Sequence, residues 1–229
     1  MHMSDRTPAV AHPAATVVLL RDGAETCEVL LVRRNAQLAF HGGAWVFPGG
    51  RIDQEDYAAA GTDDVVAAAR HAAVREAREE AGLSIAAGDL VLLSRWITPE
   101  PLPKRFDTWF FAAQAVGHDV QVDGGEIHDH RWFRIADALA AQKAGEIELP
   151  PPTFVTILSL AEHRTSAAAL ATFARGPVLT FAPRLATVTG APCTLYEGDV
   201  AYETGDATAP GPRHRLVMLD GGWRYERSD

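Results

Sequence analysis

Three glutamates, Glu76, Glu79 and Glu80, stand close together near the end of a predicted helix. At about 100° per residue they fall within an arc of roughly 100°, so their carboxylates share one side of that helix. Glu76 and Glu80 form a like-charged i,i+4 pair, which costs on the order of a few tenths of a kcal/mol. Gly82 is a natural C′ residue, which places the cluster at the negative end of the helix dipole. Because both effects are unfavourable, the pattern indicates that a cation is the missing partner.

The residue types indicate which cation. Carboxylate oxygens suit hard divalent ions such as Mg²⁺ or Mn²⁺, and no cysteine or histidine cluster accompanies them to favour Zn²⁺ or copper. Mg²⁺ usually completes its coordination shell with waters and substrate phosphates, so we expect hydrolysis of a pyrophosphate link. The alternative interpretation is a solvated charged helix face, in which Arg75 neutralises Glu79 at i+4.

The glutamates belong to a longer pattern, which runs from Arg75 to Leu83 and reads Arg-Glu-x-x-Glu-Glu-x-Gly-Leu. A Phe-Pro-Gly-Gly run lies upstream at residues 47–50. Together these segments resemble the signature of the Nudix hydrolases, which cleave nucleoside diphosphates linked to another group. The resemblance implies an α/β fold, a Nudix α/β/α sandwich with a mixed sheet, and an enzyme that depends on Mg²⁺ or Mn²⁺.

The resemblance also implies roles for individual residues. The expected site residues are Arg75, Glu76, Glu79 and Glu126 for catalysis, Glu76, Glu79 and Glu80 for the metal, and Arg34, Phe47, Gly49, Gly50 and Arg105 for the substrate. Arg75 is expected to orient the glutamates. The general base stays open between Glu79, Glu76 and the downstream Glu126. Gly49 and Gly50 permit close approach of the backbone.

The spacing departs from the family pattern at one place. Asp56 stands where the family has a glutamate after Gly50, and a longer segment than usual separates Asp56 from Arg75, which indicates an insertion. In the alternative alignment Gly61 takes the place of Gly50, but Ala67 then occupies the glutamate position. We prefer the first alignment because the Phe-Pro-Gly-Gly run is the expected entry from a strand into the loop.

A looser resemblance concerns the substrate. The runs at residues 96–99, 105–108 and 110–111 look like the coenzyme A diphosphatase branch of the family, of the peroxisomal animal type. This branch predicts coenzyme A or an acyl derivative as the substrate, with Arg34 and Arg105 as candidates for holding a phosphate. The alternatives are an ADP-ribose or dinucleotide pyrophosphatase and, outside the enzymes, a non-catalytic nucleotide-binding module.

The segment before Phe47 gives mixed support for that branch. Arg34 and Gly43 match the spacing that the coenzyme A branch tends to have, whereas Val32, Asn35 and Ala39 depart from it. The sequence therefore leaves the substrate open.

Strands and helices that would position these residues follow from apolar runs and turn signals. Strands are expected at residues 15–20, 27–34, 45–47, 90–99, 109–113 and 131–133, and helices at 63–81, 135–144, 153–163 and 165–174. Thr62 is a plausible N-cap of the helix that carries the glutamates. Further short strands are expected at 178–181, 186–189 and 214–219, with a turn leading to 223–225.

Three regions are expected along the chain. Residues 1–14 would form a flexible N-terminal arm, 15–176 the hydrolase domain, and 177–229 a β-rich C-terminal extension. About fifty residues is little for an independent core, so the extension would pack on the domain or on a partner subunit, and a homodimer is possible.

Composition narrows the partners. The 229 residues carry a net charge of −9, which argues against broad binding to nucleic acid or an anionic membrane. The apolar runs are too short to span a bilayer, and Cys27 and Cys193 form no recognisable metal or redox motif. We therefore expect a cytoplasmic protein that acts on a small nucleotide.

Overall fold

A computed structural model describes residues 8–37, 42–115, 120–122 and 125–228 of the chain. The helices are α1 (Gln54–Ala60), α2 (Val65–Ala81), α3 (Ile135–Lys143), α4 (Pro151–Leu160) and α5 (Ser166–Arg175), with a 3₁₀ turn η1 (Ala87–Asp89). The strands are β1 (Ala11–Asp22), β2 (Cys27–Arg34), β3 (Trp45–Val46), β4 (Gly49–Arg51), β5 (Val91–Ile97), β6 (Arg105–Gln114), β7 (Ile127–Arg134), β8 (Leu179–Phe181), β9 (Arg184–Val188), β10 (Ala191–Leu195), β11 (His214–Val217) and β12 (Arg224–Arg227).

The larger sheet is mixed, with the order β3-β2-β1-β6-β5-β8. β1 runs parallel to β6 from Ala11, opposite Arg105, to Leu20, opposite Gln114. β4 pairs with the first half of β1, and β7 pairs with β2. The pair β5–β8 is also parallel, and the remaining pairs of this sheet are antiparallel. The predicted mixed sheet is confirmed.

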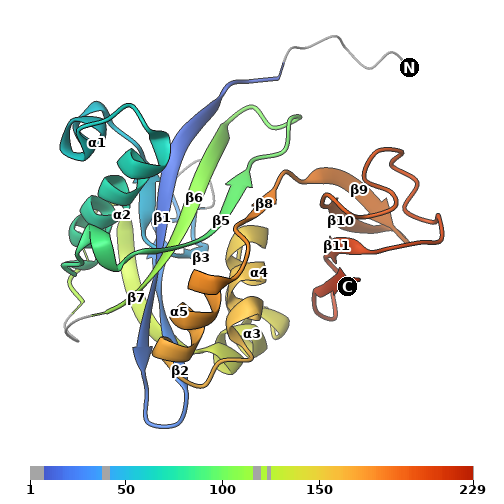
Figure 1. Cartoon of the computed structure of the whole chain (residues 1–229). Helices are drawn as coiled ribbons and strands as arrows, with labels where there is room; N and C mark the ends of the chain where they lie inside the picture. The colour runs from blue at the N-terminus through green and yellow to red at the C-terminus, as the bar shows by residue number, and fades with distance from the viewer. Residues whose placement is uncertain (1–7, 38–41, 116–119, 123–124, 229) are drawn as a thin grey trace.

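Helices cover both faces of this sheet (Figure 1). Successive side chains of β1 point to opposite faces, so Val17 packs under α2 while Val18 packs among α3, α4 and α5. The face of α2 that meets the sheet is built almost entirely from buried alanines, such as Ala69 and Ala73. These small side chains let the helix lie close to the strands. The result is the expected α/β/α sandwich.

The helix that carries the glutamates begins slightly later than predicted. Its N-cap is Asp64, whose Oδ1 accepts a hydrogen bond of 2.7 Å from the backbone N–H of Ala67, so the predicted start at Asp63 with Thr62 as the cap is wrong. The insertion before it contains helix α1, which the sequence analysis did not predict. Asp53 and Asp56 form a capping box at the start of α1, and that pair was the available signal.

Two strands begin earlier than predicted. β1 starts at Ala11, so residues 11–14 belong to the sheet and not to a loose arm. β6 starts at Arg105, because this end of the strand pairs with Ala11–Ala14. The pairing of these two strand ends thus lengthens both strands. Of the rest of the expected arm, residues 8–10 belong to no helix or strand, and residues 1–7 lie outside the described residues.

The C-terminal extension forms a second sheet, antiparallel and in the order β12-β11-β10-β9. β8 was assigned to this extension from the sequence, but it pairs with β5 in the larger sheet. β10 was not predicted. Aromatic contacts join the two sheets: Tyr196, which follows β10, meets the rings of Trp96 and Phe181 in the larger sheet edge-on, with ring centroids 5.8 and 5.2 Å apart. The extension therefore packs on the domain, as the lobe on the right of Figure 1.

One ion pair is fully buried in this second sheet. Arg215 is 2% exposed, and its Nε and Nη2 donate to Oδ2 and Oδ1 of Asp199 at 2.7 and 2.6 Å. Asp199 also accepts from the backbone N–H groups of Ala201 and His214. Burial alone would raise the pKa of Asp199, but these hydrogen bonds hold it below its usual value.

Among the described residues, no helix combines the length and the apolar character that crossing a membrane requires.

Candidate active site

A cavity of about 780 Å³ lies where the larger sheet, the end of α2 and the C-terminal sheet meet. It brings together most of the predicted site residues: Arg34, Phe47, Gly49, Gly50, Glu76, Glu79, Glu80 and Glu126 all line it. Arg105 does not line it, and Arg75 lies behind the glutamates.

The glycine loop and the helix position the glutamates together. β4 holds Gly49 and Gly50 against β1, opposite Thr16 and Ala15. The backbone N–H of Gly49 donates to Oε2 of Glu80 at 2.9 Å. At Gly50 the absent side chain matters, because a Cβ there would overlap the carboxylate of Glu76. The Glu76 carboxylate therefore lies directly against the loop backbone.

Substituting Gly50 by Ala tests this contact. The added methyl group must displace Glu76, so we expect the Mg²⁺ concentration for half-maximal activity to rise about tenfold or more, with a loss of about 1–3 kcal/mol in the free energy of unfolding. Activity titrations with Mg²⁺ and urea denaturation measure the two effects. Gly88→Ala is the matched control, because a Cβ at Gly88 meets nothing within 4 Å. An unchanged Mg²⁺ requirement in Gly50→Ala would show that the close contact is unimportant.

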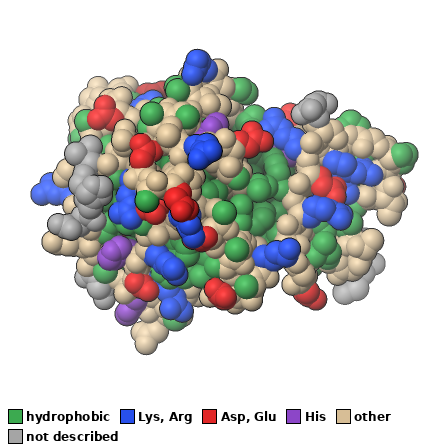
Figure 2. All heavy atoms as spheres, turned by 90° about the horizontal axis from the view of Figure 1, so that it is seen from below, with side chains coloured by type: hydrophobic (Ala, Val, Ile, Leu, Met, Phe, Trp, Pro, Cys, Tyr) green, Lys and Arg blue, Asp and Glu red, His purple; other side chains and the backbone are tan. Residues whose placement is uncertain are grey.

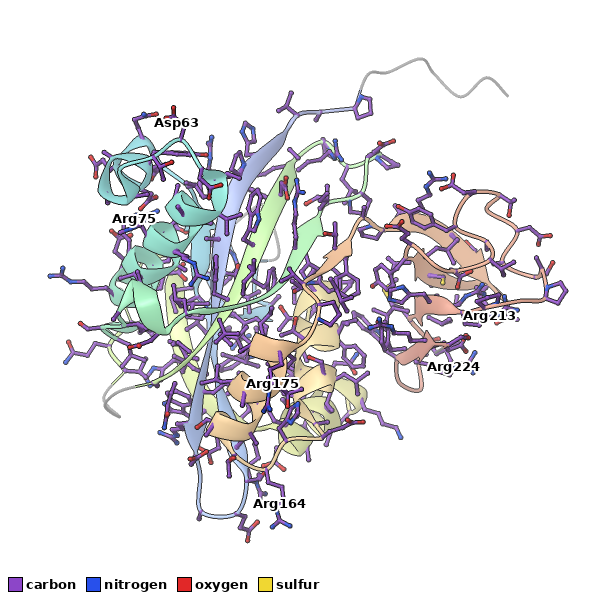
Figure 3. All side chains as sticks on the ribbon, in the orientation of Figure 1. Asp63, Arg75, Arg164, Arg175, Arg213 and Arg224 are labelled. Carbon is purple, nitrogen blue, oxygen red and sulfur yellow. The ribbon has the colours of Figure 1, made fainter. Side chains whose placement is uncertain are left out.

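Arg75 connects the glutamates to the inserted helix. Its Nη1 donates to Glu76 Oε1 at 2.8 Å and to Glu79 Oε2 at 3.0 Å. Its Nε and Nη2 donate to the two oxygens of the buried Asp56 at 3.2 and 3.0 Å. Figure 3 shows Arg75 on α2, close to α1. Asp56 therefore fixes the guanidinium of Arg75 on one side, and Arg75 orients the carboxylates of Glu76 and Glu79 on the other.

Asp56 is thus more than a replacement for a missing glutamate. It is the N3 residue of α1, where it also accepts a hydrogen bond of 2.9 Å from the backbone N–H of Asp53. The inserted residues follow Asp56 and include the rest of α1. They therefore leave the contact between Asp56 and Arg75 intact. The sequence analysis identified Asp56 by its position but did not assign it this contact.

Burial and the neighbouring carboxylates both raise the pKa values of Glu76 and Glu80. Burial raises the pKa of Glu80 to about 8, even though the Gly49 N–H and the charge of Arg34 lower it. Burial also raises the pKa of Glu76, against the opposing effect of Arg75. Glu126 is close enough to raise the pKa of both. To keep all of these carboxylates ionised, the site needs additional positive charge.

The residues fit a divalent cation by their donor chemistry. The cavity offers carboxylate oxygens, which Mg²⁺ and Mn²⁺ prefer, and none of the described residues that line it is a cysteine or a histidine. In the part of the chain that the structure describes, no three acidic, imidazole or thiol groups converge on one point. Glu76 and Glu79 are instead bonded to Arg75, and Glu80 to Gly49.

Arg34 and Glu126 meet at the edge of the cavity. The backbone N–H of Asn35 donates to the carbonyl of Glu126 at 2.8 Å, and Arg34 Nη2 lies 3.9 Å from Glu126 Oε2. Among the described residues, the buried Nε of Arg34 has no hydrogen-bond partner. Arg34 is therefore placed to bind an additional anion.

Arg105 was also expected to bind a substrate phosphate, and the structure does not support that role. Its Nε donates to the carbonyl of Thr98 at 3.0 Å and its Nη1 to the carbonyl of Ala9 at 2.7 Å. It therefore joins the N-terminal segment to the end of β5. Lys104 beside it lines the cavity instead, a residue that the sequence analysis did not select.

Away from the carboxylates, and apart from Lys104 and several threonines, much of the cavity wall is apolar. Trp96, Phe106 and Phe110 come from β5 and β6, and Leu185 and Met218 come from the C-terminal sheet. Seen from below in Figure 2, hydrophobic side chains gather between the larger part of the molecule and the smaller lobe. From the sequence, the extension was expected to cap the pocket or to mediate a dimer, but none of its individual residues was predicted to line the site.

The site can now be compared with known proteins. The NUDIX domain family matches residues 10–151, which include the glycine loop, α2 and the four glutamates of the cavity, Glu76, Glu79, Glu80 and Glu126. The chain belongs to the NUDIX family. It is therefore an enzyme, a pyrophosphohydrolase, and enzymes of this family generally use divalent metal ions. The match ends at the start of α4, so the C-terminal sheet of this NUDIX hydrolase lies beyond it.

Solved structures agree with this assignment. A NUDIX hydrolase from Alicyclobacillus acidocaldarius is 27% identical, with a TM-score of 0.66 over 74% of this chain and 99% of its own. The NUDIX domain of Shewanella oneidensis NrtR, solved as a complex with ADP ribose, is 18% identical, with a TM-score of 0.52 over 67% of this chain and 88% of that domain. The second likeness shows a shared fold. No curated protein matches the sequence.

Proposed function

We propose that this NUDIX hydrolase cleaves the pyrophosphate bond of a nucleoside diphosphate derivative with Mg²⁺ or Mn²⁺. The observation that carries the proposal is the cavity itself. It combines three glutamates at the end of α2, an arginine with an unpartnered buried nitrogen among the described residues, and an apolar wall. If the glutamates and Arg34 bind the diphosphate, the two groups that the diphosphate links would occupy the rest of the cavity.

Each charged residue would have a separate task. Glu76, Glu79 and Glu80 would hold the metal, which when bound polarises the phosphoryl oxygens and activates a water. Arg75 keeps two of these carboxylates in place. The general base would be Glu79, Glu76 or Glu126, which all line the same cavity.

Arg34 is the candidate for binding the diphosphate. It lies close enough to Glu80 to lower the pKa of that carboxyl, and close to Glu126. A guanidinium in that position can donate two hydrogen bonds to a phosphate.

Coenzyme A or an acyl derivative is the substrate that we propose. The apolar wall suits the pantetheine or acyl part, and Lys104, which lines the cavity beside Phe106, suits the 3′-phosphate as a point charge. ADP-ribose or a dinucleotide is the alternative, since either shares the diphosphate but lacks a long apolar group.

A substrate panel tests the assignment. With Mg²⁺ or Mn²⁺, we expect kcat/KM for coenzyme A to exceed that for dephospho-coenzyme A by roughly one to two orders of magnitude, because one charge-assisted contact to the 3′-phosphate contributes about 1.5–3 kcal/mol. Lys104→Ala should remove this preference, whereas Arg34→Ala should slow both substrates equally. Faster hydrolysis of ADP-ribose than of either substrate would instead support the alternative.

A further inference from the structure

The C-terminal sheet supplies part of the cavity wall, although it lies outside the segment that matches the family. Its contribution consists of Pro183, Leu185, Thr194 and Met218. None of these residues is charged. Any group that binds against these side chains therefore meets apolar surface and one hydroxyl, and not an ion.

Exposed apolar side chains gather at the same place. Four large hydrophobic residues are exposed among the described residues, and two of them, Leu102 at 37% and Leu185 at 52%, line the cavity. They come from different parts of the chain, the connection between β5 and β6 and strand β9. An apolar ligand that covered both would remove this surface from water.

The position of the sheet determines which part of a substrate reaches it. Arg75, which bonds Glu76 and Glu79, and Arg213 and Arg224 of the C-terminal lobe lie on opposite sides of the molecule in Figure 3. The glutamates at the end of α2 and the residues of the C-terminal sheet are thus separate parts of the cavity lining, so the groups that a diphosphate links can extend from the glutamates toward this sheet. A cavity of about 780 Å³ is within the range that holds a drug-sized ligand, roughly 300–1,000 Å³.

We propose that the C-terminal sheet is a specificity element that binds a fatty acyl or alkyl chain at the remote end of the substrate. Leu185 and Met218 are the residues that contact this chain. The inference rests on the proposed function, and it narrows the substrate class to nucleoside diphosphate derivatives that carry an apolar chain.

Binding measurements without metal ions separate this inference from the hydrolytic reaction. Isothermal titration calorimetry in EDTA compares three probes: octanoyl-coenzyme A, coenzyme A and ADP-ribose. We expect the wild-type protein to bind octanoyl-coenzyme A at least about tenfold more tightly than coenzyme A, since burying about two methylenes is sufficient for that ratio. Leu185→Ser should reduce the ratio to about twofold and leave the affinity for ADP-ribose unchanged.

Val178→Ser is the matched control, because Val178 is an exposed hydrophobic residue of similar size that does not line the cavity. It should retain the full ratio. Met218→Ser provides a second variant on the same wall. Equal affinity of the wild type for octanoyl-coenzyme A and coenzyme A overturns the proposal, as does a full ratio in both Leu185→Ser and Met218→Ser.

Two further outcomes have separate meanings. If Leu185→Ser converts a dimer into a monomer in light scattering, Leu185 belongs to a subunit contact and the proposal falls. If the binding ratios are as expected but no probe is hydrolysed with Mg²⁺ or Mn²⁺, the proposed function fails while the chain-binding wall remains.

Discussion

Replacing Glu80 by Gln is expected to lower turnover at least about a hundredfold while the protein stays folded. The amide oxygen of Gln can still accept the hydrogen bond from the Gly49 N–H, so the local structure is retained. What is lost is an anionic oxygen among those that would hold the metal. Steady-state hydrolysis at saturating Mg²⁺ and Mn²⁺ measures the effect, and Glu79→Gln should behave in the same way.

Glu55→Gln is the control for this experiment, because Glu55 is exposed on α1 and does not line the cavity. Its activity should equal that of the wild type. In the absence of metal, Glu80→Gln should also be slightly more stable, by about a few tenths of a kcal/mol, since it removes a carboxyl group whose ionised form is disfavoured by burial and by the neighbouring carboxylates. Wild-type rates from Glu80→Gln would refute its role as a metal ligand.

Replacing Arg215 by Met is expected to destabilise the protein by about 3–5 kcal/mol. The variant leaves Asp199 buried and charged, with its bidentate partner gone and only backbone N–H groups to bond it. Tyr196 and Met218 of the C-terminal sheet pack into the larger hydrophobic core, so we expect the substitution to lower the stability of the domain as well. The free energy of unfolding from urea denaturation provides the measurement.

The outer pair Arg224–Glu226 on β12 gives the matched comparison. Its arginine is largely exposed, so Arg224→Met should cost less than about 1 kcal/mol. Figure 3 shows Arg224 on the same lobe. Equal stability of Arg215→Met and Arg224→Met would mean that the buried pair contributes no more than a surface contact does.

Much of the fold followed from local patterns. The apolar runs located β2, β3 and β5, the spaced glutamates located the end of α2, and one Gly-Gly turn signal separated β11 from β12. These features depend on residues that are near one another in the sequence, so a single chain is sufficient to predict them.

The features that were missed depend on distant residues. Arg105 looked like a phosphate ligand, but its guanidinium bonds the carbonyls of Thr98 and of Ala9 in the N-terminal segment, whose course the sequence did not indicate. The early start of β1 has the same cause, because it is determined by parallel pairing with β6. Leu185 and Met218 reach the cavity because Tyr196 of the second sheet packs on Trp96 and Phe181 of the larger sheet.

The buried cysteines and the inserted segment together have a practical consequence. Burial raises the pKa of the Cys27 and Cys193 thiols to about 11, so neither reacts readily near neutral pH. The turn after α1, in contrast to the two cysteines, is accessible to reagents. Asp63 is exposed, and a Cβ at Gly61 would meet nothing within 4 Å. A cysteine introduced as Asp63→Cys would therefore give one selective attachment point for a fluorophore, beyond the Asp56–Arg75 contact and clear of the cavity.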